Sequence, residues 1–327
     1  MAVLAAAALI LALIFAYRIM RGLEIHADGN ADLDGQTPGY SEEVGRPMVA
    51  LQGNWYELKE NVETVLLIGI DKFSMQVEQT SAYRSDQQSD FLLLLVLDHD
   101  KRVCTPLHIN RDTMAPIHML GLSGEDVGTF EGQLALAHTY GEGRALAAEN
   151  TVRSVSEFLY GTQIDHYVSF TMDAVPVFND AVGGVTVDVR DDFSAVDPTI
   201  TQGQMTLKGE QALTFVRSRG EMEDSSNLAR MERQRQYVTA AYRQARTYAA
   251  DHSRRAELVM QVSPYIASDC TVQQLAELSD AMSGYELAET RTIAGEARLG
   301  EQFMEFYPDE SDLARQLVDL LYEPVED

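Results

Sequence analysis

The sequence has little lysine and little cysteine, and each shortage excludes a class of protein. Only four of its 25 basic residues are lysines, so nearly all of its positive charge is arginine. Against 51 acidic residues the formal net charge is −26, so the chain lacks the basic surface that nucleic-acid binding requires. The two cysteines, Cys104 and Cys270, follow no metal-ligand spacing and are too few for a disulfide framework. We therefore expect no nucleic-acid partner and a buried free thiol at Cys104, and leave a pairing with Cys270 open.

Several familiar catalytic motifs are also missing. The seven histidines form no HExxH pattern, so each is expected to be structural or exposed. Neither a Walker A loop nor a GxGxxG turn occurs, and Ser123 stands outside a GxSxG elbow. Zinc hydrolases of that type, nucleotide-binding enzymes with those loops and serine esterases are excluded.

An unbroken apolar run of 17 residues, "MAVLAAAALILALIFAY", begins the sequence. As a helix it would be about 25 Å long, near the lower limit for crossing a bilayer. Because no small-x-small cleavage site follows it, an uncleaved transmembrane anchor over residues 1–21 is favoured over a signal peptide. Arg18 and Arg21 follow this span, which by the positive-inside tendency would leave the bulk of the protein in the cytoplasm. The orientation must therefore be decided by the function of the rest.

The remaining pattern predicts an α/β fold. Residues 22–60 are rich in Gly, Asp and Glu and are expected to be a linker or stalk. Residues 61–327 are expected to form one domain with a central mixed β-sheet flanked by helices. Its motif-bearing core covers 62–245, and a helical C-terminal part covers 246–327, with Asp309 as a helix cap.

Two carboxylates and an arginine are expected at one edge of this sheet. The runs at 91–97 and 102–109 predict a hairpin, and a turn centred on His99-Asp100 sets Asp90 beside Ile109 and diagonal to Arg111. Asp71 follows the buried strand expected at 65–70. If that strand runs parallel to 102–109, Asp71 reaches the same edge, because ligands gather at the carboxyl ends of strands in α/β sheets.

An arginine-rich stretch supplies further cationic groups. Arg217 and Arg219 are two residues apart, so in an extended segment they point to one side. Arg230 and Gln234 are four apart in a helix expected over 227–248, and share a face. Guanidinium groups bind phosphate with two parallel hydrogen bonds, and carboxylates hold Mg²⁺. The combination indicates pyrophosphate binding and phosphoryl transfer.

The simpler alternative is that each arginine is a surface residue paired with one of the many acids. We expect this for Arg233 and Arg235, which lie off the face of Arg230, as solvated groups or partners of nearby acids. The absence of lysine and the matched spacing of the others favour the anion site.

These residues lie in motifs that resemble those of the LytR–CpsA–Psr family. The motifs "VLLIGID", "SDFLLLLVLDHDKRVCTPLHINRDT", "IDHYVSF…AVGGVTVDV" and "LKGEQALTFVRSR…DSSNLARMERQRQ" follow in the family's order over roughly residues 62–245. The resemblance implies a membrane-anchored, single-pass enzyme with its domain outside the cell membrane. It would transfer a glycopolymer, such as teichoic acid or capsular polysaccharide, from a polyprenyl-pyrophosphate carrier to peptidoglycan.

The resemblance also implies roles for particular residues. Asp71 and Asp90 would hold Mg²⁺ (or Mn²⁺), and together with Arg111 they would be the catalytic set. The pyrophosphate-binding positions would be Arg111, Arg217, Arg219, Arg230 and Gln234.

The chain departs from the family pattern at two places. Gln88-Ser89-Asp90 stands where the family usually has Arg-Ser-Asp, and such a triplet occurs four residues earlier as Arg84-Ser85-Asp86. The spacing to Arg111 fits Asp90 and not Asp86, so Asp90 is the predicted ligand. Asn110 replaces the usual proline before the Arg-Asp pair.

Two other functions use the same arginines. One is a non-catalytic or regulatory cell-envelope protein that binds polyprenyl-pyrophosphate lipids, and the other is a pyrophosphatase acting on them. A protein that only binds needs no metal-holding carboxylates, so the presence of Asp71 and Asp90 favours the enzyme.

Overall fold

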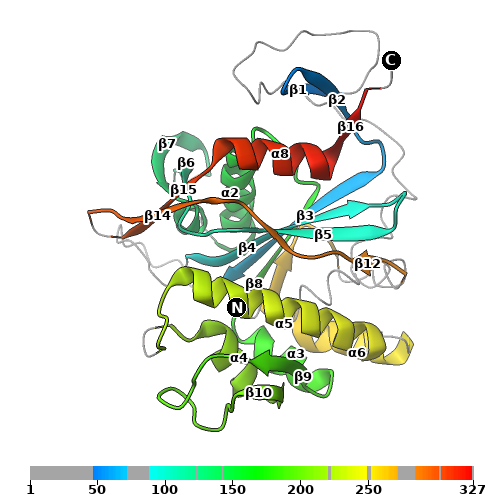
Figure 1. Cartoon of the computed structure of the whole chain (residues 1–327), viewed down its shortest axis with the longest axis vertical. Coiled ribbons are helices and arrows are strands. Elements are labelled where there is room, and N and C mark those ends of the chain that lie inside the picture. The colour runs from blue at the N-terminus through cyan, green and yellow to red at the C-terminus, as the bar shows by residue number, and fades with distance from the viewer. Residues whose placement is uncertain are drawn as a thin grey trace.

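A mixed β-sheet lies at the centre of the computed structural model (Figure 1). The structure describes residues 47–71, 88–121, 124–141, 143–219, 222–248, 252–271, 284–301 and 303–325. Within them seven strands pair in the order β11-β8-β3-β4-β5, with β12 and β13 both along β5. Their bounds are β3 Val62–Ile70, β4 Ser89–Asp98, β5 Val103–Ile109, β8 His166–Thr171, β11 Ile266–Ser268, β12 Glu286–Leu287 and β13 Arg291–Thr292. β4 is antiparallel to both β3 and β5, so β3 and β5 run in the same direction, which is the condition for Asp71 to reach the edge of Arg111.

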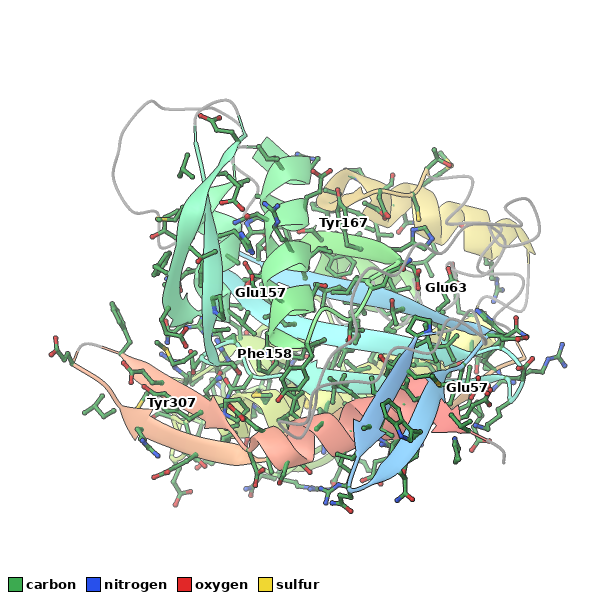
Figure 2. All side chains as sticks on the ribbon, turned by 90° about the horizontal axis from the view of Figure 1, so that it is seen from above. Glu57, Glu63, Glu157, Phe158, Tyr167 and Tyr307 are labelled. Atoms are coloured by element: carbon green, nitrogen blue, oxygen red, sulfur yellow. The ribbon has the colours of Figure 1, made fainter. Side chains whose placement is uncertain are left out.

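Helices cover both faces of this sheet, which explains the continuous apolar runs of β3 and β4. One face packs against α2 (Gly143–Phe158) and α8 (Glu310–Leu321) through alternate residues such as Leu92 and Leu94. Phe158 of α2, labelled in Figure 2, belongs to this core. The other face packs, through Phe91 and Leu93, against α3 (Ala174–Ala181), α4 (Glu210–Arg217), α5 (Asn227–Tyr248) and α6 (His252–Val262). Neither face of the central strands meets water.

Smaller elements surround the two layers. These are β1 Met48–Leu51, β2 Asn54–Leu58 and β16 Tyr322–Pro324 in one sheet, the pairs β6 Met114–Leu120 with β7 Asp126–Gln133, β9 Val185–Val189 with β10 Gly203–Leu207 and β14 Gly295–Leu299 with β15 Met304–Pro308, and the 3-10 helices η3 Leu134–Tyr140 and η4 Ser263–Tyr265. β14 and β15 project from one side of the molecule in Figure 1.

Two expectations about the ends of the domain need correction. The end of the expected linker is folded, because β1 and β2 pair with each other and β2 pairs with β16. Among the described residues after 246, short strands accompany the helices α6 and α8, and four of these strands lie between 286 and 308. Periodicity failed there because edge strands of two to five residues carry too few side chains to show a pattern. Asp309 caps α8 as expected, accepting hydrogen bonds from the backbone N–H groups of Ser311 and Asp312.

The expected transmembrane anchor over residues 1–21 lies outside the described residues. In the part of the chain that the structure describes, no helix combines the length and the apolar character needed to cross a membrane.

The β4–β5 hairpin has a different register from the one expected. Leu92 faces Ile109 and Asp98 faces Val103, which shifts the pairing by two residues and leaves the loop His99–Arg102. Asp98 Oδ1 accepts a hydrogen bond of 2.9 Å from the Lys101 N–H, and Arg102 takes a left-handed φ of 55°. A four-residue loop closed in this way, rather than a two-residue turn, fixes the register. If this register is continued by two residues beyond the Leu92–Ile109 pair, Asp90 of β4 comes opposite Arg111.

Candidate active site

The carboxyl ends of β3 and β5 and the amino end of β4 meet at one edge of the sheet. Asp71 follows β3, Asp90 is the second residue of β4, and Arg111 lies two residues beyond β5. Ile70 faces Ser89 across β3 and β4, so Asp71 and Asp90 stand on adjacent strands, which lie about 4.8 Å apart in a sheet. The sequence-predicted trio is therefore brought to one place.

A β-bulge directs Asp90 within this edge. Gly69 faces Phe91 but Ile70 faces Ser89, so Asp90 is an extra residue without a partner on β3. By strict alternation it would share the face of Leu92, on the side of α2 and α8. The bulge breaks that alternation, and Asp90 Oδ1 lies 3.6 Å from Nη1 of Arg230, which belongs to α5 on the opposite face. Bulges commonly redirect a side chain beside an active site.

Arg111 contacts Asp90, and a second carboxylate, that of Asp112, holds its guanidinium in place. Its Nη1 donates to Asp90 Oδ1, while its Nε donates to Asp112 Oδ1 at 3.2 Å. Asp112 is buried and also accepts a 3.3 Å hydrogen bond from Gln133. The Arg111 side chain is 16% exposed, so one guanidinium edge is fixed by protein and the group still reaches the surface.

Arg230 is a cation buried at the start of α5, and 6% of the residue is exposed. Its Nη2 donates to Asn227 Oδ1 at 2.6 Å, and Asn227 donates to Asn110 Oδ1 at 2.9 Å. Its Nε has no hydrogen-bond partner among the described residues. Burial, followed by repulsion from Arg111 and Arg219, lowers the pKa of Arg230 to about 9. A buried guanidinium surrounded by like charges is stabilised by an added anion.

Arg217 and Asp71 form a second, looser pair. Arg217 was expected in an extended segment, but it is the last residue of α4. Its Nη2 lies 3.9 Å from Asp71 Oδ1. That oxygen is buried and accepts no hydrogen bond from the described residues. Arg219 lies two residues further on and is exposed, and its charge still acts on the pKa of Arg230. Both arginines therefore lie close to the carboxylate edge.

The remaining residues of α5 divide between packing and the surface. Gln234, one turn after Arg230, is completely buried. Arg235 pairs with Glu232 as expected. Arg233 is not solvated: only 4% of it is exposed, its Nε donates to Phe215 O at 3.1 Å, and it forms an ion pair of 2.7 Å with Asp191.

Arg233 therefore stabilises the segment that carries Arg217 and Arg219. It also donates to the Ser218 carbonyl, so it clamps the end of α4 and the residue between Arg217 and Arg219. Sequence reasoning missed this role, as it missed Asn110 and Asn227, because the partners are separated by 15 to 117 residues along the chain. The substitution of Asn for proline at 110 was the one available signal, since Asn110 Oδ1 also accepts from the Asp112 N–H.

Cys104 is a buried free thiol of β5, as expected, and Cys270 is also free. Burial raises the pKa of the Cys104 thiol, which makes it unreactive. His108 lies on β5, three residues before Arg111, and is likewise buried. Burial, followed by repulsion from Arg235 and Arg230, lowers its pKa well below the usual value. It is neutral at pH 7 and adds no charge to the arginine cluster.

Curated relatives and a solved structure resemble this chain. The polyisoprenyl-teichoic acid–peptidoglycan teichoic acid transferase TagU of Oceanobacillus iheyensis is 28% identical over 195 residues, which are 60% of this chain and 55% of that protein. The protein of the same name from Halalkalibacterium halodurans is 31% identical over 188 residues, 57% of this chain and 54% of that protein. This chain thus spans about half the length of these relatives.

The fold agrees with these sequence matches. The crystal structure of TagV from B. subtilis superposes with a TM-score of 0.61 at 25% identity, and the match covers 80% of this chain and 98% of that one. The sequence model of the LytR_cpsA_psr family matches residues 30–318. These residues include Asp71, Asp90 and the whole arginine cluster, and the chain belongs to the LytR-CpsA-Psr family.

Proposed function

We propose that the chain is a Mg²⁺-dependent phosphotransferase. Its substrate would be a glycopolymer of the teichoic acid or capsular polysaccharide type on a polyprenyl-pyrophosphate carrier, and its acceptor peptidoglycan. The observation that carries the proposal is the convergence of Arg111 and Arg230 on one oxygen of Asp90, with Arg219 nearby. Two guanidinium groups around a single carboxylate oxygen form a site that a phosphate oxygen also fits.

The carboxylates fit a divalent cation. Mg²⁺ takes oxygen ligands, usually one or two carboxylates together with substrate phosphates. Asp71 Oδ1 is buried without a hydrogen bond among the described residues, a costly state that a cation would relieve. Asp71 and Asp90 would hold the metal, and Mn²⁺ has the same ligand preference. The chemistry that a bound cation supplies there is neutralisation of charge on the pyrophosphate.

The arginines would bind and orient the pyrophosphate. Asp90 contacts Arg111 and Arg230, and when substrate binds, the two guanidiniums would exchange this carboxylate for phosphate oxygens. A hydroxyl of peptidoglycan would then attack the phosphorus that carries the sugar. A new P–O bond to the acceptor forms, the P–O bond to polyprenyl phosphate breaks, and that phosphate leaves. The hydroxyl proton would pass to a carboxylate oxygen of Asp71 or Asp90 that does not hold the metal, although a metal-bound carboxylate is a weak base.

A transfer assay tests the proposed function. The purified protein would be incubated with lipid-linked saccharide, peptidoglycan oligomers and Mg²⁺, and the products analysed by mass spectrometry. We expect a saccharide phosphate joined to the acceptor and free polyprenyl phosphate, both lost when EDTA removes the metal. Released saccharide phosphate without transfer would make the protein a pyrophosphatase, and binding without any product would make it a non-catalytic binding protein.

Replacing Arg217 by lysine should weaken substrate binding. Lysine keeps the charge but loses the planar fork that binds phosphate with two hydrogen bonds. Because Arg217 is exposed and its only close carboxylate among the described residues is 3.9 Å away, the folded protein should not be destabilised. We expect lipid-pyrophosphate affinity to fall about tenfold, which corresponds to about 1.4 kcal/mol. Isothermal titration at constant Mg²⁺ measures it, and Arg190→Lys, also exposed and paired only with Asp188 in the described structure, is the control. Wild-type affinity in Arg217→Lys would mean that Arg217 is an ordinary surface residue that does not bind the pyrophosphate.

The substrates also require a location. Both the lipid carrier and peptidoglycan are cell-envelope components, so we propose a single-pass anchor at residues 1–21 with the folded domain outside the cell. Protease added to intact cells should therefore remove the domain, while a cytoplasmic marker protein stays intact. Full protection of the domain under these conditions would refute this topology.

A further inference from the structure

A second cluster of polar residues lies at the opposite end of the sheet from Asp71. His166 is the first residue of β8, Glu63 is the second residue of β3, and Asp269 and Cys270 follow β11. From Glu63 to Asp71 the chain advances eight residues, roughly 26 Å at 3.3 Å per residue. The cluster is therefore separate from the phosphate site.

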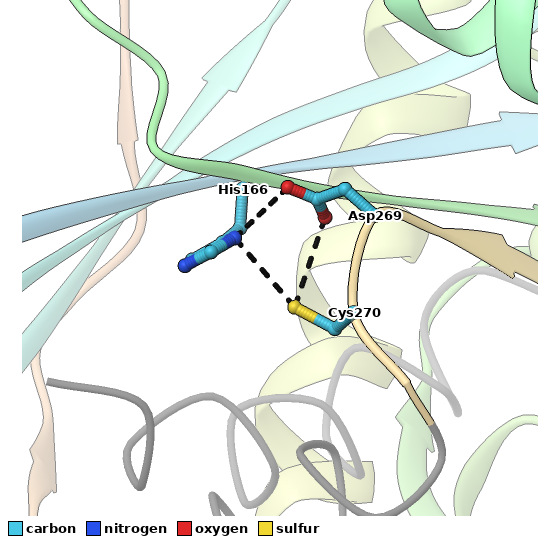
Figure 3. A group of neighbouring side chains, drawn as sticks. All are labelled: His166, Asp269 and Cys270. Carbon is cyan, nitrogen blue, oxygen red and sulfur yellow. Dashed lines mark hydrogen bonds and ion pairs between the residues drawn. The ribbon is translucent and has the colours of Figure 1, made fainter. Parts of the chain in front are cut away.

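Three different donor atoms converge in this cluster (Figure 3). His166 Nδ1 lies 2.9 Å from Asp269 Oδ2 and 3.6 Å from Cys270 Sγ, and Cys270 Sγ lies 3.7 Å from Asp269 Oδ1. A tetrahedral Zn²⁺ with bonds of about 2.0–2.3 Å to nitrogen, oxygen and sulfur separates its ligand atoms by roughly 3.3–3.6 Å. The separation of nitrogen and sulfur matches this range, and one ligand atom from each of the three side chains lies within 4.8 Å of the other two.

The backbone that carries Asp269 and Cys270 is fixed by the sheet. Ser268 pairs with Val168 across β11 and β8, and its Oγ donates to Tyr167 O at 2.7 Å. The same Oγ accepts from the Cys270 N–H at 3.0 Å, and Asp269 Oδ1 accepts from the Tyr167 N–H at 3.2 Å. The ligand atoms are thus held by strands rather than by a loose loop, which favours a preformed site.

Glu63 orients the histidine from the other side. Its side chain is 3% exposed, and its Oε1 lies 3.5 Å from His166 Nε2, the ring nitrogen that faces away from Cys270. Figure 2 labels Glu63 on β3. A metal-bound histidine typically has its second ring nitrogen at a carboxylate, which sets the tautomer and directs the free lone pair at the ion.

We propose that His166 Nδ1, Asp269 and Cys270 Sγ bind a zinc-class ion, with Glu63 as the positioning residue of His166. The thiolate selects a borderline or soft metal and disfavours Mg²⁺, which prefers oxygen ligands. Three protein ligands leave one position of a tetrahedral ion for water or another ligand. The bound ion would join the end of β11 to β8 and Glu63 of β3, and so stabilise one edge of the sheet.

A second histidine shows what an ordinary charged contact looks like in this protein. His118 Nδ1 lies 2.8 Å from Asp126 and its Nε2 lies 2.6 Å from Glu157. These two carboxylates lie at opposite ring nitrogens and cannot share an ion. At His166 the Asp269 carboxylate and the Cys270 thiol converge on Nδ1, and the second carboxylate, that of Glu63, lies at Nε2.

Cobalt titration of the purified full-length protein tests the proposal. Co²⁺ replaces Zn²⁺ in tetrahedral sites, and a thiolate ligand adds an intense near-ultraviolet charge-transfer band. We expect this band to saturate at one Co²⁺ per chain, to disappear on addition of Zn²⁺ and to persist in excess Mg²⁺. Zn²⁺ should also raise the melting temperature by a few degrees, because an ion that binds only the folded state stabilises it.

Variants separate the site from other thiols and histidines. Cys270→Ala should lose the band, whereas Cys104→Ala, which removes the buried thiol, should keep it. Glu63→Gln should weaken the metal affinity about 10–100-fold, and His118→Gln should leave it unchanged. Circular dichroism of each metal-free variant establishes that it is folded. Absence of the band from the wild type, as expected if His166 and Asp269 share only a proton, or its retention in Cys270→Ala, would overturn the proposal.

Discussion

Asp90→Asn should reduce Mg²⁺-dependent transfer on the order of a thousandfold. The amide cannot hold the cation as a carboxylate does, and the loss of several kcal/mol of charge stabilisation corresponds to this factor in rate. Binding should respond differently. Asp90 Oδ1 contacts both Arg111 and Arg230, and the neutral amide oxygen of Asn would hold the two guanidiniums more weakly than the carboxylate does. Without metal, affinity for the lipid pyrophosphate should be unchanged or tighter, while turnover is lost.

Asp86→Asn is the matched control. Asp86 follows Arg84-Ser85, the same order of residues that the family usually has before its metal ligand, and it lies outside the described residues. Arg111 contacts Asp90 in the structure, and the spacing to Arg111 fits Asp90 and not Asp86, so this variant should keep most of the activity. Steady-state transfer kinetics with varied Mg²⁺, together with metal-free binding, distinguish the two. Equal losses in both variants would contradict the assignment of the metal to Asp90.

Arg230→Met should stabilise the ligand-free protein and impair substrate binding. Burial and neighbouring arginines lower the pKa of Arg230 from 12.5 to about 9, so its charge is disfavoured in the folded state. Below pH 9 the guanidinium is charged in both states and the cost is present in full, and it declines as pH rises through 9. Arg230→Met removes this buried charge and leaves Asp90 still paired with Arg111, so the free energy of unfolding should increase. Affinity for the lipid pyrophosphate should fall about 10–100-fold, as expected for a lost charged hydrogen bond of about 1.5–3 kcal/mol.

Denaturant unfolding at pH 7 and pH 10 measures the first effect, and titration with the lipid the second. The stability advantage of Arg230→Met over the wild type should be smaller at pH 10. Arg235→Met, on the same helix, removes a half-buried guanidinium that is paired with exposed Glu232, and should change stability much less. A destabilised Arg230→Met would mean that Asp90 and Asn227 already compensate the charge of Arg230, and that no anion is needed there.

The sequence predicted the central sheet well because its signals are local. Continuous apolar runs marked β3 and β4, and the arginine-rich helix was predicted with the bounds that α5 has. The edge strands after residue 286 were missed because they owe their extended form to pairing with β5 and with each other. Propensity and periodicity carry little information about such segments.

The candidate site was predicted in composition but not in geometry. Residue type and spacing led to Asp71, Asp90 and the arginines, and the structure brings them to one edge of the sheet. The bulge at Asp90 and the loop length of the hairpin depend on hydrogen bonds between residues that no sequence pattern marks. The role of Arg233 depends on three acceptors from two other segments, so only the folded chain reveals it.

The pairing of β2 with β16 also determines how far the domain can reach from a membrane. If residues 1–21 are an anchor, the tether is counted from the anchor to the first fixed strand and not to residue 60. Strand pairing removes residues 48–60 from it, which is roughly 43 Å of extended chain at 3.3 Å per residue. Lys59 further ties this point to the end of α8 by donating to Leu320 O at 2.7 Å. Truncating the last strand would therefore lengthen the tether at the opposite end of the sequence and let the arginine cluster move further from the lipid surface.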